Sequence, residues 1–127
     1  MSSGVLFVSP HPEDANRLLQ ILGPLPVQLD HVQDLSHART KLEYECYPVI
    51  LTDTELPDGA WPDVLDLARE KSPDAQVILT SRFADARLWT EALGRGVYDL
   101  LAQPFEAFEV RRILASACRI YAHRYAT

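Results

Sequence analysis

The stretch Pro-Val-Ile-Leu-Thr-Asp-Thr-Glu-Leu-Pro-Asp-Gly, residues Pro48 to Gly59, decides the fold of this chain. Its first part, residues 49–52, is a short apolar run rich in β-branched residues, which suits a buried strand and is too short for a helix. Asp53 follows at once, and residues 56–59 then have the composition of a turn. The stretch therefore predicts a single carboxylate at the C-terminal end of a buried strand, the edge at which ligands bind in open parallel sheets.

Similar apolar runs lie on both sides of this stretch and alternate with segments of helical periodicity. The expected strands are residues 5–8, 26–32, 49–52, 76–80 and 97–102. A first helix carries Leu18, Ile21, Leu22 and Leu25 on its apolar face. The later helices are expected over residues 34–46, 62–72, 84–93 and 106–124, the fourth being closed by Gly94. Strict alternation predicts an α/β fold, a doubly wound parallel sheet with helices on both faces and strand order 2-1-3-4-5.

The bulk composition indicates one soluble domain over residues 1–127. The formal net charge of -6 argues against nucleic-acid binding by this domain. We expect no signal peptide and no membrane association, because a basic leader and a long apolar run are both missing from the sequence. Cys46 and Cys118 lack any CxxC spacing, and we interpret them as reduced, small core residues of a cytoplasmic protein.

Polar residues follow the strands at the edge where Asp53 is expected. Ser9-Pro10 follows the first strand, Thr80-Ser81 ends the fourth, and Gln103-Pro104 follows the fifth. The loop after the first strand is not glycine-rich, there is no P-loop motif, and the four histidines have no metal-ligand spacing. These features do not predict an enzyme.

Four stretches together resemble the receiver domain of a bacterial two-component response regulator, which has a flavodoxin-like (βα)5 fold. They are residues 5–8, 49–53 with 56–59, 77–81 and 96–105. The resemblance implies phosphoryl transfer from a histidine kinase to Asp53, with Thr80 holding the phosphoryl group. It also implies Mg²⁺ bound by Asp53 and the backbone carbonyl of Glu55, and a cis peptide bond between Gln103 and Pro104.

The sequence departs from the family pattern at four positions. Ser9 and Pro10 stand where the family has an acidic pair that helps to hold Mg²⁺, Gln103 replaces a lysine, and Leu100 replaces an aromatic switch residue. Phosphoryl transfer depends on neutralising the charge of the phosphoryl oxygens. Loss of such charged groups typically costs several kcal/mol of stabilisation at a preorganised site. The departures therefore weaken the case for Mg²⁺ as a cofactor.

Neighbouring residues offer two interpretations. Glu13 and Asp14 could reach a cation, or they could simply stabilise the N-terminus of the first helix. His11 could bind a metal ion or a phosphoryl group, or it could be an exposed loop histidine without a role. For Glu13 and Asp14, and likewise for His11, the second interpretation is favoured because it requires no bound ligand. Asp53 itself could do no more than cap the turn that follows it.

The sequence thus leaves several functions open. The domain is predicted to be a receiver with Asp53 as phosphoacceptor, and the alternative is a phosphorylation-independent interaction module. A small-ligand-binding flavodoxin-like protein is a third interpretation. The expected partners are a histidine kinase or another signalling protein, or a second copy bound through residues 84–93, 97–102 and 106–124. Trp89 lies on that face, where an exposed aromatic would favour binding.

Overall fold

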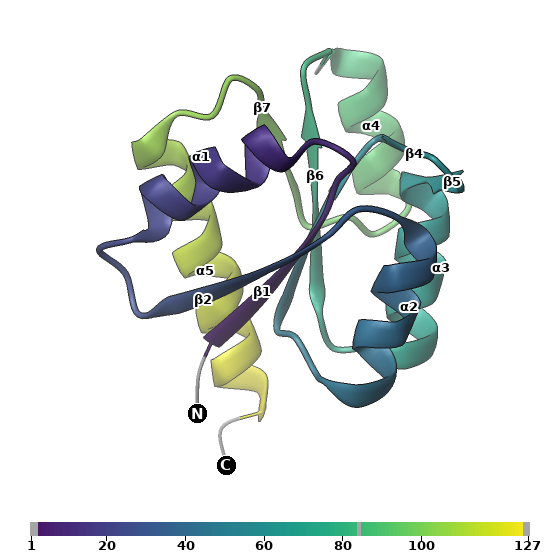
Figure 1. Ribbon diagram of the computed structural model, residues 1–127, viewed down its shortest axis with the longest axis horizontal. Coiled ribbons are helices and arrows are strands. Elements are labelled where there is room, and N and C mark those ends of the chain that lie inside the picture. Colours follow the sequence, from purple (N-terminus) through teal and green to yellow (C-terminus); the bar gives the residue numbers. More distant parts are fainter. Residues whose placement is uncertain (1–2, 84, 126–127) are drawn as a thin grey trace.

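The computed structural model describes residues 3–83 and 85–125 and has the predicted alternation of strands and helices (Figure 1). The elements in chain order are β1 (Ser3–Val8), α1 (Pro12–Leu22), β2 (Val27–Val32), α2 (Leu35–Tyr44), β3 (Val49–Asp53), β4 (Glu55–Leu56), β5 (Gly59–Ala60), α3 (Trp61–Lys71), β6 (Gln76–Ser81), α4 (Ala86–Gly94), β7 (Asp99–Ala102) and α5 (Ala107–Tyr125). None of these helices is both long enough and apolar enough to span a membrane.

Five of the strands form one parallel sheet in the order β2-β1-β3-β6-β7. This is the predicted 2-1-3-4-5 order when the five strands of the sheet are numbered along the chain, so the doubly wound fold is confirmed. The remaining two strands, β4 and β5, form a two-residue antiparallel hairpin where the sequence predicts only a turn. The hairpin directly follows Asp53, so it borders the predicted site.

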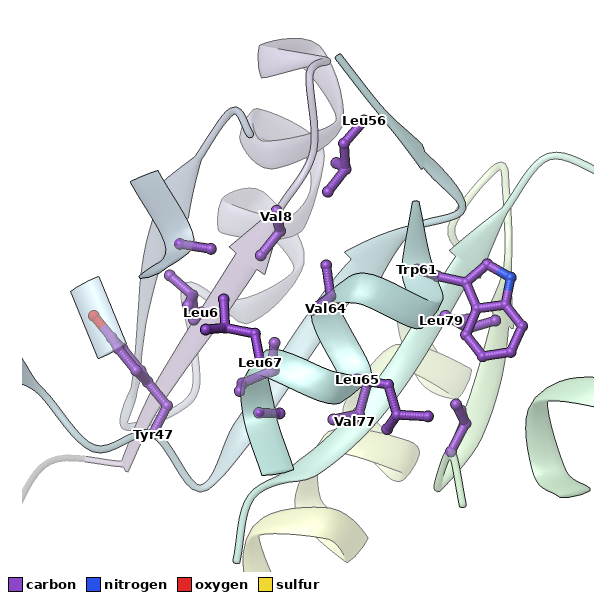
Figure 2. Close-up of a cluster of buried hydrophobic side chains, with 14 of the residues drawn as sticks. Leu6, Val8, Tyr47, Leu56, Trp61, Val64, Leu65, Leu67, Val77 and Leu79 are labelled. Atoms are coloured by element: carbon purple, nitrogen blue, oxygen red, sulfur yellow. The ribbon is translucent and has the colours of Figure 1, made fainter. Parts of the chain in front are cut away.

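The central strand β3 is buried along its whole length because helices cover both faces of the sheet. Val49 and Leu51 belong to the cluster under α1 and α5, and Ile50 belongs to the cluster under α2 and α3. Figure 2 shows the second cluster, in which Val64 and Leu67 of α3 lie against Leu6 and Val8 of β1. This two-sided burial explains why the strand sequence is continuously apolar.

The hairpin is attached to α2 through one carboxylate. The Asp58 side chain accepts the backbone N–H groups of Leu35 and Ser36 at 2.8 and 3.0 Å. These amides have no acceptor within the helix, since they belong to its first turn. Asp34 caps the same helix by accepting the N–H of His37 at 2.8 Å. The segment after Asp53 is therefore connected to a helix that lies before it in the sequence.

The structure corrects two predictions. Gly94 does not close the fourth helix, because α4 includes it; the glycine with positive φ, 101°, is Gly96, two residues later. The predicted start of that helix at residue 84 lies outside the described residues. Cys46 is exposed rather than buried, because it lies in the loop between α2 and β3, and Cys118 is only partly buried.

Candidate functional site

Asp53 is the last residue of β3 and lies at the C-terminal edge of the sheet. In the pairing of β3 with β6, Asp53 lies opposite Thr80, so the two residues are neighbours on adjacent strands. Asp53 is 8% exposed and Thr80 is fully buried. Asp53 Oδ1 accepts the N–H of Thr54 at 2.8 Å, and Oδ2 lies 3.8 Å from His11 Nε2.

Burial raises the pKa of Asp53 above its ordinary value, and three neighbours oppose this shift. The N–H of Thr54 lowers this pKa, and the charges of His11 and Arg82 lower it too, whereas the charge of Asp14 raises it. Two cationic or potentially cationic side chains therefore act on the ionised carboxylate of Asp53.

His11 is positioned by a well-connected loop between β1 and α1. Its N–H donates to Ser9 Oγ at 3.1 Å, and the carbonyl of Ser9 lies 2.8 Å from Nε2 of His31 on β2. The ring of His11 lies between Asp53 and Glu13, whose Oε1 is 3.6 Å from His11 Nδ1. Ser9 is fully buried and holds the loop backbone in place at a position where a metal ligand would be expected.

Arg82 binds the carboxylate of Asp14, which the sequence offered as a replacement metal ligand. Arg82 follows β6 directly, and its guanidinium donates to Asp14 Oδ1 at 2.9 Å and to Oδ2 at 3.1 Å. Asp14 is in the first turn of α1 and is 8% exposed. This buried carboxylate is therefore already neutralised by a side chain of the protein.

Two cavities meet at Arg82. One, of about 430 Å³, is lined by His11, Asp53, Thr54, Glu55, Ser81, Arg82, Phe83 and Leu88. The other, of about 380 Å³, is lined by Asp14, Arg17, Arg82, Gln103, Pro104 and Phe105. Gln103 thus lines the second cavity and not the one that contains Asp53.

Two polar atoms at this edge are buried and have no hydrogen-bond partner within residues 3–83 and 85–125. They are Thr80 Oγ1 and Gln103 Oε1. The backbone of Gln103 does have a partner, since its N–H donates to the carbonyl of Ser81 at 2.8 Å. The peptide bond between Gln103 and Pro104 is cis, which confirms that prediction.

The residues at the edge do not fit a divalent cation. Mg²⁺ prefers oxygen ligands and is usually bound through one or two carboxylates. Asp53 offers one carboxylate, Asp14 is bound by Arg82, and the exposed Glu55 can contribute its backbone carbonyl. In the part of the chain that the structure describes, no three acidic, histidine or cysteine residues are grouped so that they could hold a metal ion.

Sequence reasoning undervalued His11 and missed Arg82. For His11 the sequence leaves two interpretations open and favours a loop residue without a role, yet its Nε2 lies 3.8 Å from Asp53 Oδ2. The sequence pattern does not single out Arg82, although it comes one residue after Ser81 and hence follows a strand at the same edge. The signal that could have found it is a basic residue at this edge in a chain that lacks the family's lysine.

Curated relatives match most of this chain, but the matches cover only part of the relatives' own length. No family model matches. The response regulator protein PilR of Pseudomonas aeruginosa is 28% identical over 116 residues, which are 91% of this chain and 26% of PilR. The luminescence regulatory protein LuxO of Vibrio campbellii is 30% identical over 98 residues, 77% of this chain and 22% of LuxO. The chain thus spans about a quarter of the length of these relatives.

Solved structures agree with the fold. The signal receiver domain of a LuxO repressor protein from Vibrio parahaemolyticus has a TM-score of 0.91 at 22% identity, covering 98% of this chain and 95% of that one. The beryllofluoride-activated NtrC4 receiver domain dimer has a TM-score of 0.86 at 27% identity, with 94% and 98% covered. The receiver domain of the Pseudomonas aeruginosa sensor histidine kinase PA1611 has a magnesium ion in its active-site cleft. Its TM-score is 0.80 at 24% identity, and the match covers 94% of this chain and 99% of that one.

Proposed function

This chain is a response regulator receiver domain of two-component signalling, and from that premise we propose that it acts as a phosphorylation-independent protein-interaction module. Receiver domains are in general signalling modules and not enzymes, and we extend this to the present chain. The observation that carries the proposal is the pair of contacts between Arg82 and Asp14, because it removes the carboxylate that could have replaced the missing acidic pair.

Electrostatics support this choice. A phosphoryl group on Asp53 would bring further negative charge to a site whose carboxylate is already buried. Phosphoryl transfer needs that charge neutralised in the transition state. Gln103 carries no charge and lines a different cavity. His11 and Arg82 already act as counter-charges of Asp53, without a metal ion.

A phosphorelay is the second candidate, and one observation favours it. Asp53 and Thr80 are neighbours in the register of β3 and β6, and the buried hydroxyl of Thr80 has no hydrogen-bond partner in the described part of the chain. In this alternative Asp53 accepts phosphate from a histidine kinase and Thr80 binds the phosphoryl group. Asp53 and the carbonyl of Glu55 would then hold Mg²⁺, and the amide of Gln103 would donate a hydrogen bond.

For the interaction module we propose a partner surface formed by α4, β7 and α5. Four large apolar side chains are exposed on α4 and α5: Trp89 at 44%, Leu93 at 41%, Phe108 at 72% and Ile120 at 38%. Large exposed apolar side chains support an interaction surface on these elements. We propose that a cytoplasmic signalling protein or a second copy of the chain binds there, and that residues 1–127 act as one receiver unit without nucleic-acid or membrane binding.

Intact mass spectrometry separates the two candidates. The protein is incubated with a small phosphodonor and Mg²⁺, beside the variant Asp53→Asn. The interaction-module proposal expects no added phosphoryl group in either sample. A stoichiometric gain of one phosphoryl group, absent in Asp53→Asn, would contradict it and establish the phosphorelay.

A further inference from the structure

We propose that Arg82 is a resident counter-cation that takes the electrostatic place of a divalent metal ion at the Asp53 edge. The inference rests on the proposed function, since it explains how the ionised carboxylates at the C-terminal edge of the sheet can be stable without a bound metal ion. It concerns the part of the site where the sequence lacks the family's acidic pair and lysine.

The position of Arg82 in the fold supports this role. It directly follows β6, which is the neighbour of β3 in the sheet, so its backbone emerges beside Asp53. Its guanidinium contacts both oxygens of Asp14, at 2.9 and 3.1 Å, and its side chain lines both cavities of the edge. A single arginine therefore connects α1 with the loop after β6.

The two carboxylates whose charge Arg82 compensates are both buried. Asp14 and Asp53 are each 8% exposed, and the two charges act on one another. Two buried carboxylates near each other need a counter-charge. Without Arg82 they would form an oxygen-rich site of the kind that attracts a divalent cation. With Arg82 bound, the same position carries a positive charge that repels such an ion.

Other charged groups complete the arrangement. His11 lies 3.8 Å from Asp53 Oδ2, the carboxylate oxygen that does not accept the N–H of Thr54, and 3.6 Å from Glu13. Arg17 lines the cavity of Gln103, next to Asp14. The unpartnered Oε1 of Gln103 is also in this part of the edge. The edge therefore carries basic side chains beside both of its buried acids.

The test is a Mg²⁺ titration of four proteins by isothermal calorimetry: the natural chain, Arg82→Gln, Arg87→Gln and the double variant Asp14→Asn/Arg82→Gln. Arg87 is a matched control, because it is an exposed arginine on the neighbouring helix α4. We expect Arg82→Gln to bind Mg²⁺ about tenfold or more tightly than the natural chain, since a repelling charge is removed and Asp14 is released. Arg87→Gln should behave like the natural chain, and the double variant should lose the gain.

Equal Mg²⁺ affinity in the natural chain and Arg82→Gln would overturn the inference. Should Arg82→Gln fail to fold, a second measurement on the natural chain decides: Mn²⁺ should not broaden the amide signals of His11 and Thr54 in a ¹H–¹⁵N spectrum, and selective broadening of these signals would overturn the inference. Failure of the proposed function is recognised separately. Phosphorylation of Asp53 that persists in EDTA would contradict the proposed function but not the role of Arg82.

Discussion

At the scale of single residues, Asp53 is an acid in an environment that opposes its ionisation. It is 8% exposed, and burial is the largest influence on its pKa, which is raised. The N–H of Thr54 and the charges of His11 and Arg82 compensate only in part. An acid whose pKa is raised on folding favours the folded state when protonated, so its contribution to stability falls as the pH rises from the unfolded value through the folded pKa.

We therefore expect Asp53→Asn to increase stability at pH 7 by about 1 kcal/mol. The amide keeps the shape of the carboxyl group and can still accept the N–H of Thr54, but it carries no buried charge. The advantage should shrink as the pH falls through the raised pKa of Asp53, and it should vanish below the unfolded value. Urea denaturation over a pH series measures this, with the exposed Asp66→Asn as control. A less stable Asp53→Asn at pH 7 would show that the ionised carboxylate stabilises the fold.

Two glycines near the end of α4 offer a second comparison at this scale. Gly96 has φ of 101°, and a Cβ there would lie 2.8 Å from a guanidinium nitrogen of Arg69. Gly94 is helical, and a Cβ there would meet no atom within 4 Å. We expect Gly96→Ala to cost roughly 1–2 kcal/mol and Gly94→Ala to stabilise by about 0.5–1 kcal/mol. Thermal unfolding of the two variants should show shifts of opposite sign, and shifts of the same sign would contradict this assignment of the helix end.

At the scale of elements, the hairpin β4-β5 depends on its attachment to α2. Asp58 accepts two amides of the first turn of that helix, and the Asp63 side chain accepts the N–H of Ala60 at the start of α3. The segment bordering Asp53 is thus held by carboxylate caps on two helices. The hairpin that carries Glu55 is therefore also held by hydrogen bonds to the ends of two helices.

We expect Asp58→Ala to destabilise the protein by about 1 kcal/mol, because two amides of α2 lose their acceptor. Hydrogen exchange should accelerate at Leu35 and Ser36 and across the hairpin, while the amides of β3 keep their protection. Asp66→Ala, on the exposed face of α3, is the matched control. Unchanged exchange at Leu35 and Ser36 in Asp58→Ala would indicate that these hydrogen bonds contribute little in solution.

The sequence was sufficient for the elements but not for the contacts between their ends. Buried strands are readable because both faces of the sheet are covered, so residues such as Val49, Ile50 and Leu51 form continuous apolar runs. The hairpin and the true helix end at Gly96 were missed because two-residue strands and single backbone dihedrals leave little trace in composition. Arg82 was missed for a different reason: its partner Asp14 lies 68 positions away in the sequence.

At the scale of the whole molecule, polar and apolar groups are distributed unevenly over the surface. The charged groups around Asp53 gather at the C-terminal edge of the sheet, whereas Trp89, Leu93 and Phe108 are exposed on α4 and α5. The two regions are connected through the loop between β6 and α4, which contains both Arg82 and the exposed Phe83. Leu88, in the first turn of α4, lines the cavity that contains Asp53, so this end of α4 borders the charged edge.

We expect Trp89→Ala to weaken self-association or partner binding by tenfold or more, since exposed aromatics commonly dominate interfaces. The stability of the free domain should change by no more than about 0.5 kcal/mol, as is usual for surface positions. Light scattering coupled to size-exclusion chromatography, over a range of protein concentrations, measures self-association. Tyr44→Ala is the control, because Tyr44 is 82% exposed at the end of α2. Equal association of the two variants would exclude the α4 surface.

The strand order also determines how the molecule can assemble during synthesis. The first strand, β1, is internal, and it acquires its two neighbours β2 and β3 as the first half of the chain emerges. Every later strand, β6 and then β7, joins the exposed side of the strand that was completed before it. Only the pairing of β1 with β3 must close a loop across an intervening strand and two helices. Folding of the nascent chain can therefore proceed outward from β1, and Asp53 meets Thr80 and Arg82 only after β6 has been synthesised.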